Sequence, residues 1–262
     1  MRRGTKPVDC LVMQYLKRFL AVGYGVVSYV LFLAVFLYAI GFVGGVLVPR
    51  SVDNAVATTA GQALGINLSL LALFAAQHSV MARPAFKRWW TRYLPASIER
   101  STYVLLASSL LALLFWLWRS IPFVIWDMTY PPARLAVWTL FWLGWAIVLA
   151  ATFMINHFEL FGVHQVLATW RAQPAPATGF RATMFYRVVR HPLMLGFLIA
   201  FWSAPTMTAG HLLFATVTTI YILVALRLEE RDLLASLGAR YAAYRQAVPM
   251  LVPRARRART GT

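Results

Sequence analysis

Long runs of apolar residues, separated by short polar or basic segments, alternate along the whole chain. Most of them are long enough to cross the hydrocarbon core of a bilayer, which takes about 17–25 residues of helix. The runs cover residues 19–43, 63–81, 102–118, 135–155, 193–204 and 212–228. This pattern predicts an all-α, polytopic integral membrane bundle of about six transmembrane helices, of which the last two form a C-terminal helical hairpin.

Composition supports a membrane location. Hydrophobic residues make up 60% of the 262 residues and charged residues only 13%, whereas a soluble protein carries about a quarter charged residues. We therefore expect a single integral membrane domain over residues 1–262. Residues 1–155 would form a four-span region, and residues 156–262 a cofactor-binding hairpin and a cytoplasmic C-terminal helix.

The net charge of +17 could suggest a nucleic-acid partner. The basic residues, however, flank apolar segments and form no stacking pattern with aromatic residues. We therefore expect the lipid bilayer, and no nucleic acid, as a partner. The single cysteine excludes an internal disulfide and a cysteine metal cluster, and we expect no bound metal. The pattern makes no prediction of the oligomeric state.

The basic residues also predict the orientation in the membrane. If the N-terminus is cytoplasmic and six spans alternate, 22 of the 25 Lys and Arg residues fall on the cytoplasmic side. The remaining three are Arg50, Arg119 and Arg134. Membrane proteins concentrate Lys and Arg in cytoplasmic loops. Both termini are therefore predicted to be cytoplasmic.

Polar residues gather at both ends of the last predicted hairpin. Arg190 and His191 precede its first apolar run, and Glu229 and Glu230 follow its second. A hairpin would bring these pairs to the same membrane face, and such a cluster at a bilayer edge is a site hypothesis. An ordinary interpretation also stays open. Basic residues before a membrane helix are common topology signals, and Glu230 can pair with Arg227 at i,i+3.

The order of motifs in the last quarter of the chain is specific as a set. It runs RHPLMLG (residues 190–196), an apolar hairpin, EExxLxxxxGxxYxxY (229–244) and VP (248–249). This set resembles the membrane methyltransferases of the isoprenylcysteine carboxyl methyltransferase and phospholipid N-methyltransferase type. Met194 stands where many members carry an aromatic residue, which should tune the shape of the pocket without removing a charge.

The resemblance implies S-adenosylmethionine as the methyl donor and S-adenosylhomocysteine as its product. The implied cofactor-binding residues are Arg190, His191, Pro192, Gly196, Glu229, Glu230, Tyr241 and Tyr244. The basic side chains offer donors to a carboxylate, the glutamates offer acceptors, and two tyrosines three residues apart on a helix can cover a flat ring. No GxGxxG motif follows a strand, so the soluble nucleotide-binding alternative is absent.

A second polar cluster follows the fourth predicted helix. Residues 156–165 read NHFELFGVHQ, and a lone histidine there would usually be no more than a solvated helix end. NHFELFG, together with QHSVMAR (77–83) and ERSTY (99–103), looks like the bacterial methanethiol S-methyltransferase branch of the superfamily. The resemblance makes Asn156, His157 and Glu159 candidate catalytic residues, and His78, Phe161 and Gln165 candidate substrate contacts. The base can be His157, Glu159 or a water held by them.

The resemblance implies S-adenosylmethionine-dependent S-methylation of a small volatile thiol. Methanethiol would be converted to dimethyl sulfide, and hydrogen sulfide is a further candidate acceptor. Two alternatives stay open. One is a membrane methyltransferase for a lipid, prenyl or prenylcysteine substrate, and the other is a non-enzymatic membrane protein or transporter of the NnrU-like branch. The bacterial resemblance implies a multi-pass protein of the inner (cytoplasmic) membrane.

Overall fold

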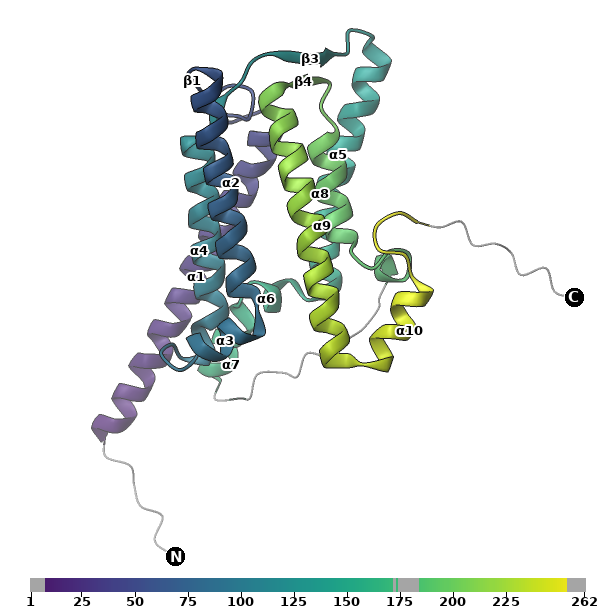
Figure 1. Ribbon diagram of the computed structural model, residues 1–262. Helices are drawn as coiled ribbons and strands as arrows, with labels where there is room; N and C mark the ends of the chain where they lie inside the picture. Colours follow the sequence, from purple (N-terminus) through teal and green to yellow (C-terminus); the bar gives the residue numbers. More distant parts are fainter. Residues whose placement is uncertain (1–7, 172, 174–183, 254–262) are drawn as a thin grey trace, which may run out of the picture. The chain divides into compact units, whose positions relative to one another are not determined.

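Five long apolar helices form most of the protein (Figure 1). The structure is a computed structural model, and it describes residues 8–171, 173 and 184–253. The long helices are α1 (Val8–Gly44), α2 (Ala60–Ala82), α4 (Ala96–Leu117), α5 (Pro131–Ile155) and α9 (Ala209–Leu237). Each is apolar and has at least 22 residues. At 1.5 Å per residue, its length exceeds the ~30 Å thickness of the hydrocarbon core. The prediction of an all-helical membrane bundle is confirmed.

The fifth predicted span, residues 193–204, is a short helix. Helix α8 (Pro192–Trp202) has 11 residues, or about 17 Å of helix, and does not cross a bilayer by itself. The chain leaves the helix at Ser203 because Pro205 disfavours helical backbone at the residue before it. It then forms strand β4 (Thr206–Thr208) and enters α9. The six predicted apolar runs thus correspond, in the part of the chain that the structure describes, to five long helices and one short apolar helix.

The remaining elements of the described chain are short. The helices are α3 (Pro84–Trp90), α6 (His157–Leu160), α7 (Val163–Trp170), the 3-10 helix η1 (Met184–Arg187) and α10 (Ala239–Ala247). Strand β1 (Val56–Ala57) pairs in parallel with β2 (Arg119–Ser120), and β3 (Val124–Asp127) pairs antiparallel with β4. The β3–β4 pairing places Asp127 opposite Thr206, and it satisfies backbone groups where the chain between α8 and α9 is not helical.

The chain divides into two compact units, and each is assembled from separate stretches of sequence. The first unit comprises Met1–Ala39, Asn67–Leu117 and Asn156–Gly179. The second comprises Ile40–Ile66, Trp118–Ile155 and Phe180–Thr262. The polar segment that follows α5 therefore groups with the N-terminal helices.

In the first unit, α7 packs against α4. The turn between α6 and α7 is made by Gly162, which has a left-handed backbone with φ of 85°. A Cβ atom at Gly162 would lie 2.7 Å from the Oγ of Ser101, so both the conformation and the close approach require glycine. Nearby, the Tyr24 hydroxyl of α1 donates to Thr102 Oγ1 of α4 at 3.0 Å. These contacts hold α6 and α7 beside the first turns of α4.

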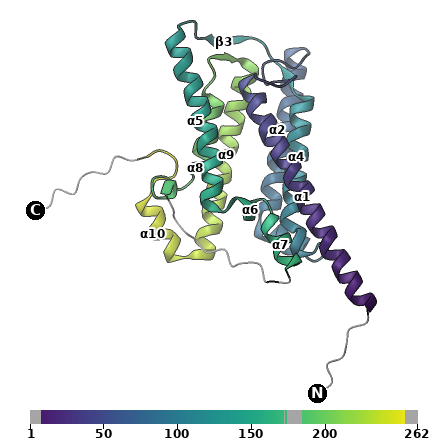
Figure 2. The same ribbon diagram turned by 180° about the vertical axis from the view of Figure 1, so that it is seen from behind.

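In the second unit, α5 and α8 approach each other through two glycines. A Cβ atom at Gly144 would lie 2.6 Å from the backbone nitrogen of Ala200, and one at Gly196 would lie 2.7 Å from the carbonyl oxygen of Gly144. Small residues allow helix backbones to pack this closely in membranes. Helices α8 and α9 form the predicted hairpin (Figures 1 and 2), and Trp202 Nε1 donates to Thr219 Oγ1 at 2.9 Å.

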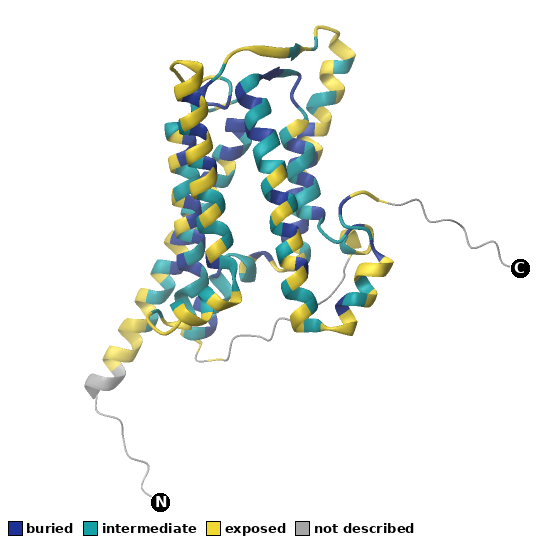
Figure 3. Cartoon of the chain, viewed as in Figure 1, coloured by how far each residue is buried: buried dark blue, intermediate teal, exposed yellow. Residues whose placement is uncertain are grey.

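Many large apolar side chains remain exposed along the long helices (Figure 3). Examples are Val27 and Leu37 of α1, Trp142 and Leu143 of α5, and Ile220 of α9. A soluble protein rarely exposes apolar surface on this scale. In a multi-pass membrane protein the same side chains face lipid.

Candidate functional site

The RHP segment is fixed in place by backbone pairing with the end of the described chain. Arg190 N donates to the carbonyl oxygen of Pro249 at 2.8 Å, and His191 N donates to that of Met250 at 3.2 Å. The chain reaches this position because Gly238, with φ of 55°, turns it from α9 into α10. The Val248-Pro249 motif therefore lies directly beside the start of α8.

Arg190, His191 and Glu230 converge across the hairpin. Arg190 Nε donates to Glu230 Oε1 at 2.7 Å, and His191 Nε2 lies 3.1 Å from the same oxygen. The three side chains are 9%, 10% and 9% exposed. The hairpin therefore assembles the polar cluster that its sequence suggested, and Glu230 pairs across the hairpin. That these residues bind a cofactor stays a prediction.

The Arg190 guanidinium also caps α10. Its Nη1 donates to the carbonyl oxygens of Arg245, at 2.8 Å, and of Val248. These carbonyls lie at the C-terminal end of α10, where intrahelical partners are missing. Arg190 thus connects the end of α10 to the buried carboxylate of α9, and this structural role accompanies any contact with a ligand.

The two tyrosines of α10 lie near this ion pair. Tyr241 is 1% exposed, and its ring centroid is 5.9 Å from that of Tyr244, with 55° between the ring planes. Burial, with the charge of Glu230, raises the pKa of Tyr241 to about 12, and burial also raises the pKa of Tyr244. Both phenols are neutral at pH 7, and the Tyr244 hydroxyl donates to the carbonyl oxygen of Tyr186 at 2.6 Å.

The other predicted cofactor residues occupy three different environments. Glu229 is exposed. Burial, and to a lesser extent the charge of Glu229, raises the pKa of Tyr186. Pro192 is buried as the first residue of α8, where its fixed φ favours helix. Gly196 faces Gly144 of α5. Helix packing therefore explains the glycine at 196.

Asn156 and Glu159 of the second cluster hold each other. Asn156 Nδ2 donates to Glu159 Oε2 at 2.9 Å, and the backbone nitrogen of Glu159 donates to Asn156 Oδ1 at 3.4 Å. Asn156 is the N-cap of α6, an ordinary place for asparagine. The carbonyl oxygen of Glu159 accepts from Arg100 Nη1 at 3.5 Å and from Gln165 Nε2 at 3.4 Å. Gln165 thus links α6 and α7.

His157 lies in an aromatic environment and is 6% exposed. Its Nε2 is 2.8 Å from the hydroxyl oxygen of Tyr29 in α1, and its ring centroid is 4.9 Å from that of Phe161. Burial lowers the pKa of His157, so the imidazole is neutral at pH 7 and can accept a proton. The sequence did not identify Tyr29. The sequence feature that could have pointed to it is a tyrosine hydroxyl within the apolar run of residues 19–43.

His78 has an aromatic environment of its own in α2. The hydroxyl oxygen of Tyr103 lies 3.0 Å from the His78 ring nitrogens, and the ring of Phe74 stacks on the imidazole at 5.3 Å. Tyr103 belongs to the ERSTY motif and His78 to the QHSVMAR motif, so the structure brings two of the motifs that carry the resemblance together within the first unit. Phe161 in turn stacks on Phe32, with 3.7 Å between ring centroids.

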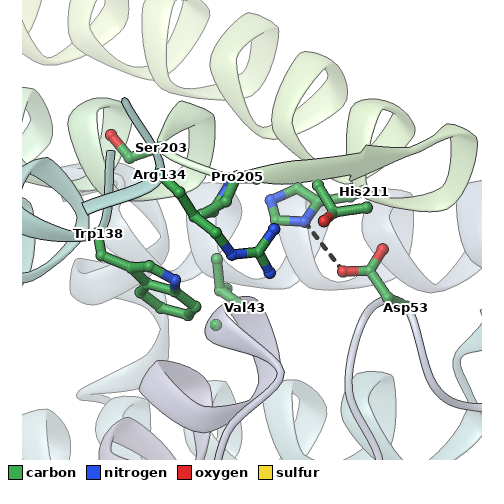
Figure 4. A pocket seen from close by; sticks show the side chains of 10 residues that line it. Val43, Asp53, Arg134, Trp138, Ser203, Pro205 and His211 are labelled. Carbon is green, nitrogen blue, oxygen red and sulfur yellow. Dashed lines mark hydrogen bonds and ion pairs between the residues drawn. The ribbon is translucent and has the colours of Figure 1, made fainter. Parts of the chain in front are cut away.

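A separate pocket of about 110 Å³ lies in the second unit, at the start of α9 (Figure 4). His211 Nδ1 is 3.4 Å from Asp53 Oδ2, and Nε2 is 2.9 Å from the carbonyl oxygen of Phe201. Arg134 and Trp138 also line the pocket. Glu230 is about 28 Å further along α9 at 1.5 Å per residue. The pocket is therefore not part of the cluster around Glu230.

No known protein-family model and no solved structure matches this chain. Nurim of Sus scrofa is 30% identical over 178 residues, which cover 65% of this chain and 68% of nurim. Methanethiol S-methyltransferase 2 of Bradyrhizobium diazoefficiens is 56% identical over 234 residues, covering 88% of this chain and 89% of the relative. Methanethiol S-methyltransferase of Mycobacterium tuberculosis is 63% identical over 238 residues, covering 91% and 98%. Because identity this high extends over nearly the whole of both chains, the protein belongs to the methanethiol S-methyltransferase family.

Proposed function

We propose that this protein transfers the methyl group of S-adenosylmethionine to the sulfur of methanethiol and thereby forms dimethyl sulfide and S-adenosylhomocysteine. The observation that carries the proposal is the 63% identity over 98% of the mycobacterial methanethiol S-methyltransferase. The RHPLMLG, EE and VP motifs that the hairpin brings together support it. Hydrogen sulfide has the same nucleophilic atom and is a second candidate acceptor.

The reaction makes three demands on the protein. The thiol sulfur attacks the methyl carbon in line with the bond to the sulfonium sulfur, which breaks as the new carbon–sulfur bond forms. The thiol proton must leave because the thiolate, not the thiol, is the nucleophile. The residues must therefore bind the donor, orient the thiol and accept or transmit its proton, while water is excluded.

The residues at the hairpin end fit a sulfonium donor with an amino acid end, a ribose and an adenine. When bound, the donor supplies an already activated methyl group. Glu229 is exposed and can accept hydrogen bonds from ammonium or hydroxyl groups, whereas the carboxylate of Glu230 is nearly buried beside Arg190 and His191. Tyr241 and Tyr244 offer neutral phenols and ring faces. Pro192 and Gly196 set the start and the packing of α8.

On the acceptor side we assign the proton-accepting role to His157. It is buried and neutral at pH 7, whereas the carboxylate of Glu159 is already hydrogen-bonded to Asn156. Asn156 and Glu159 then order α6 so that His157 is held in place. His78, Phe161 and Gln165 are the proposed substrate contacts, since they add imidazole, aromatic and amide groups to the same unit.

The membrane orientation is a further part of the proposal. The protein is a multi-pass membrane protein, and the distribution of Lys and Arg favours cytoplasmic termini in a bacterial inner membrane. S-adenosylmethionine is made in the cytosol, so its binding residues must be reached from that side. A small apolar thiol dissolves in the bilayer and can arrive through lipid.

The proposed function is tested with membranes from cells that express the protein. They receive S-adenosylmethionine with a deuterated methyl group and unlabelled methanethiol, and headspace mass spectrometry follows the volatile product. Dimethyl sulfide with one deuterated methyl group is expected, and membranes from cells with an empty vector are the control. Label that appears only in lipid or prenyl products, or no labelled product, would overturn the proposal.

A further inference from the structure

His157 and Tyr29 form a hydrogen-bonded pair although 128 residues separate them in sequence. The Tyr29 hydroxyl oxygen is 2.8 Å from His157 Nε2. The two ring planes are nearly perpendicular, at 87°, with 5.8 Å between centroids. Tyr29 lies on α1 and His157 on α6, and both belong to the first unit. The hydroxyl therefore restricts the orientation of the imidazole from a different element.

Aromatic rings hold this pair on several sides. The ring of Phe161 lies 4.9 Å from that of His157 and 6.2 Å from that of Tyr29, while Phe158 lies 5.4 Å and 6.2 Å from them. Phe32, one helical turn after Tyr29, stacks on Phe161 at 3.7 Å. The Tyr29 ring is thus positioned by its neighbours whether or not it carries a hydroxyl group.

A phenol can serve both protonation states of the imidazole. In the neutral ring one nitrogen donates and the other accepts, and in the protonated ring both donate. The Tyr29 oxygen can accept from Nε2–H in the neutral ring, which places the lone pair on Nδ1, and it can keep accepting from Nε2–H after Nδ1 has taken a proton. A buried base needs such a partner because an unsatisfied polar group in an apolar environment is costly.

We propose that Tyr29 is a positioning residue for His157 in methyl transfer: its hydroxyl fixes the tautomer and orientation in which the imidazole accepts the thiol proton. This inference rests on the proposed function, and specifically on His157 as the proton acceptor. The thiol S–H bond breaks, an N–H bond forms at Nδ1 of His157, and the thiolate is left to attack the methyl group. Tyr29 gains and loses no atoms in the net reaction.

The test compares Tyr29→Phe with Tyr24→Phe. Both changes remove one hydroxyl from α1 and keep the ring, but Tyr24 donates to Thr102 Oγ1 instead of contacting His157. We expect Tyr29→Phe to lower kcat about tenfold, a change typical of one lost hydrogen bond. The KM for methanethiol and the Kd for S-adenosylmethionine should change less than about twofold. Tyr24→Phe should keep the wild-type kcat.

Two further readouts separate positioning from general support of the fold. In full-length protein with ¹⁵N-labelled histidines, wild-type His157 should show one neutral tautomer, and Tyr29→Phe should show a mixture; the signal is assigned by its loss in His157→Ala. In the His157→Ala background, Tyr29→Phe should cause no additional loss of kcat.

The outcomes are distinguishable. A wild-type kcat and a single tautomer in Tyr29→Phe, or equal losses in the two phenylalanine variants, would overturn the positioning role. If His157→Ala keeps the wild-type rate, the assignment of His157 as proton acceptor fails, and Tyr29 loses its proposed role with it. If the wild-type protein forms no dimethyl sulfide at all, the proposed function itself fails.

Discussion

The charges of Arg190 and Glu230 are each nearly buried, so each depends on the other. Removing one partner of a buried pair typically costs about 3–5 kcal/mol, because the remaining charge is left without compensation. We therefore expect Glu230→Gln and Arg190→Met to lower both the melting temperature and the affinity for S-adenosylmethionine. Thermal unfolding and calorimetry on the purified variants check this.

Glu229→Gln is the matched control for that experiment. Glu229 is the neighbouring glutamate and is exposed, so its loss should leave the melting temperature unchanged. If it contacts the donor, the affinity should still fall roughly ten- to a hundredfold, as expected when a charge-assisted hydrogen bond is lost. Unchanged affinity in the variants at 190, 229 and 230 would contradict the placement of the cofactor site.

The neutral imidazole of His157 leads to a prediction about pH. Burial lowers the pKa of His157, so wild-type kcat should stay high at pH 7 and fall only as pH drops through this lowered pKa, where the ring becomes protonated. Tyr29 of α1 is a titratable group that contacts the imidazole, and Glu159 is a titratable group on α6, the helix of His157 itself. A profile of kcat against pH measures the midpoint. A midpoint above the ordinary histidine pKa of ~6.5 would contradict the assignment.

Replacing the base should produce a defect that depends on pH. His157→Ala should lower kcat about 10²–10⁴-fold at neutral pH, which is the usual range for general-base catalysis. The defect should shrink at alkaline pH, because solvent then supplies the thiolate. Glu159→Gln should lose less, since its carboxylate is bonded to Asn156. An equal loss at every pH in His157→Ala would indicate positioning rather than proton transfer.

Not every residue of the site could be recognised from sequence. Arg190 and Glu230 could be paired in advance, because a hairpin of two apolar runs fixes which ends meet. The partnership of Tyr29 with His157 could not, because it depends on where α6 lies against α1. The tight approach of Gly162 to Ser101 holds α6 beside α4, and the Tyr24–Thr102 hydrogen bond links α4 to α1. Neither contact leaves a periodic signal in the sequence.

At the scale of elements, the long helices were predictable because each is a continuous apolar run. Helix α8, at Pro192–Trp202, nearly coincides with the predicted run of residues 193–204, whereas the pairing of β3 with β4 that follows it was not predicted. The Gly144–Gly196 contact was not predictable either. Gly196 was predicted as part of a cofactor-binding motif, and the structure adds that it packs against α5.

The α5–α8 contact leads to a prediction about stability. In Gly144→Ala the new Cβ would lie 2.6 Å from the backbone of Ala200, so the helices must separate, at a cost of about 1–3 kcal/mol. Gly65→Ala in α2 is the control, since nothing lies within 4 Å of its Cβ position and alanine favours helix by up to ~1 kcal/mol. Thermal unfolding in detergent should show a lower melting temperature only for Gly144→Ala. Equal melting temperatures would contradict the close contact.

At the scale of the whole molecule, the number of membrane crossings needs more than a count of long helices. Five crossings would place the termini on opposite sides, whereas the predicted placement of 22 basic residues on the cytoplasmic side needs an even number. The sixth crossing can be made by α8 together with the extended residues 203–208. His191 contacts Glu230 near the end of α9, and Thr208 caps the start of α9. This connection therefore traverses the same length as α9 from its first turn to Glu230.

The orientation is tested with reporter fusions in a bacterial host. A green fluorescent protein fused after Arg259 should fluoresce and alkaline phosphatase at the same position should be inactive, because we expect the C-terminus in the cytoplasm. The matched fusion after Met128, between β3 and α5, should give the opposite result, since Arg119 and Arg134 border a segment poor in basic residues. Active phosphatase after Arg259 would mean that α8 and its extended connection do not cross the membrane. The predicted cytoplasmic access to Arg190 and Glu230 would then need another explanation, although their contact across the hairpin would be unaffected.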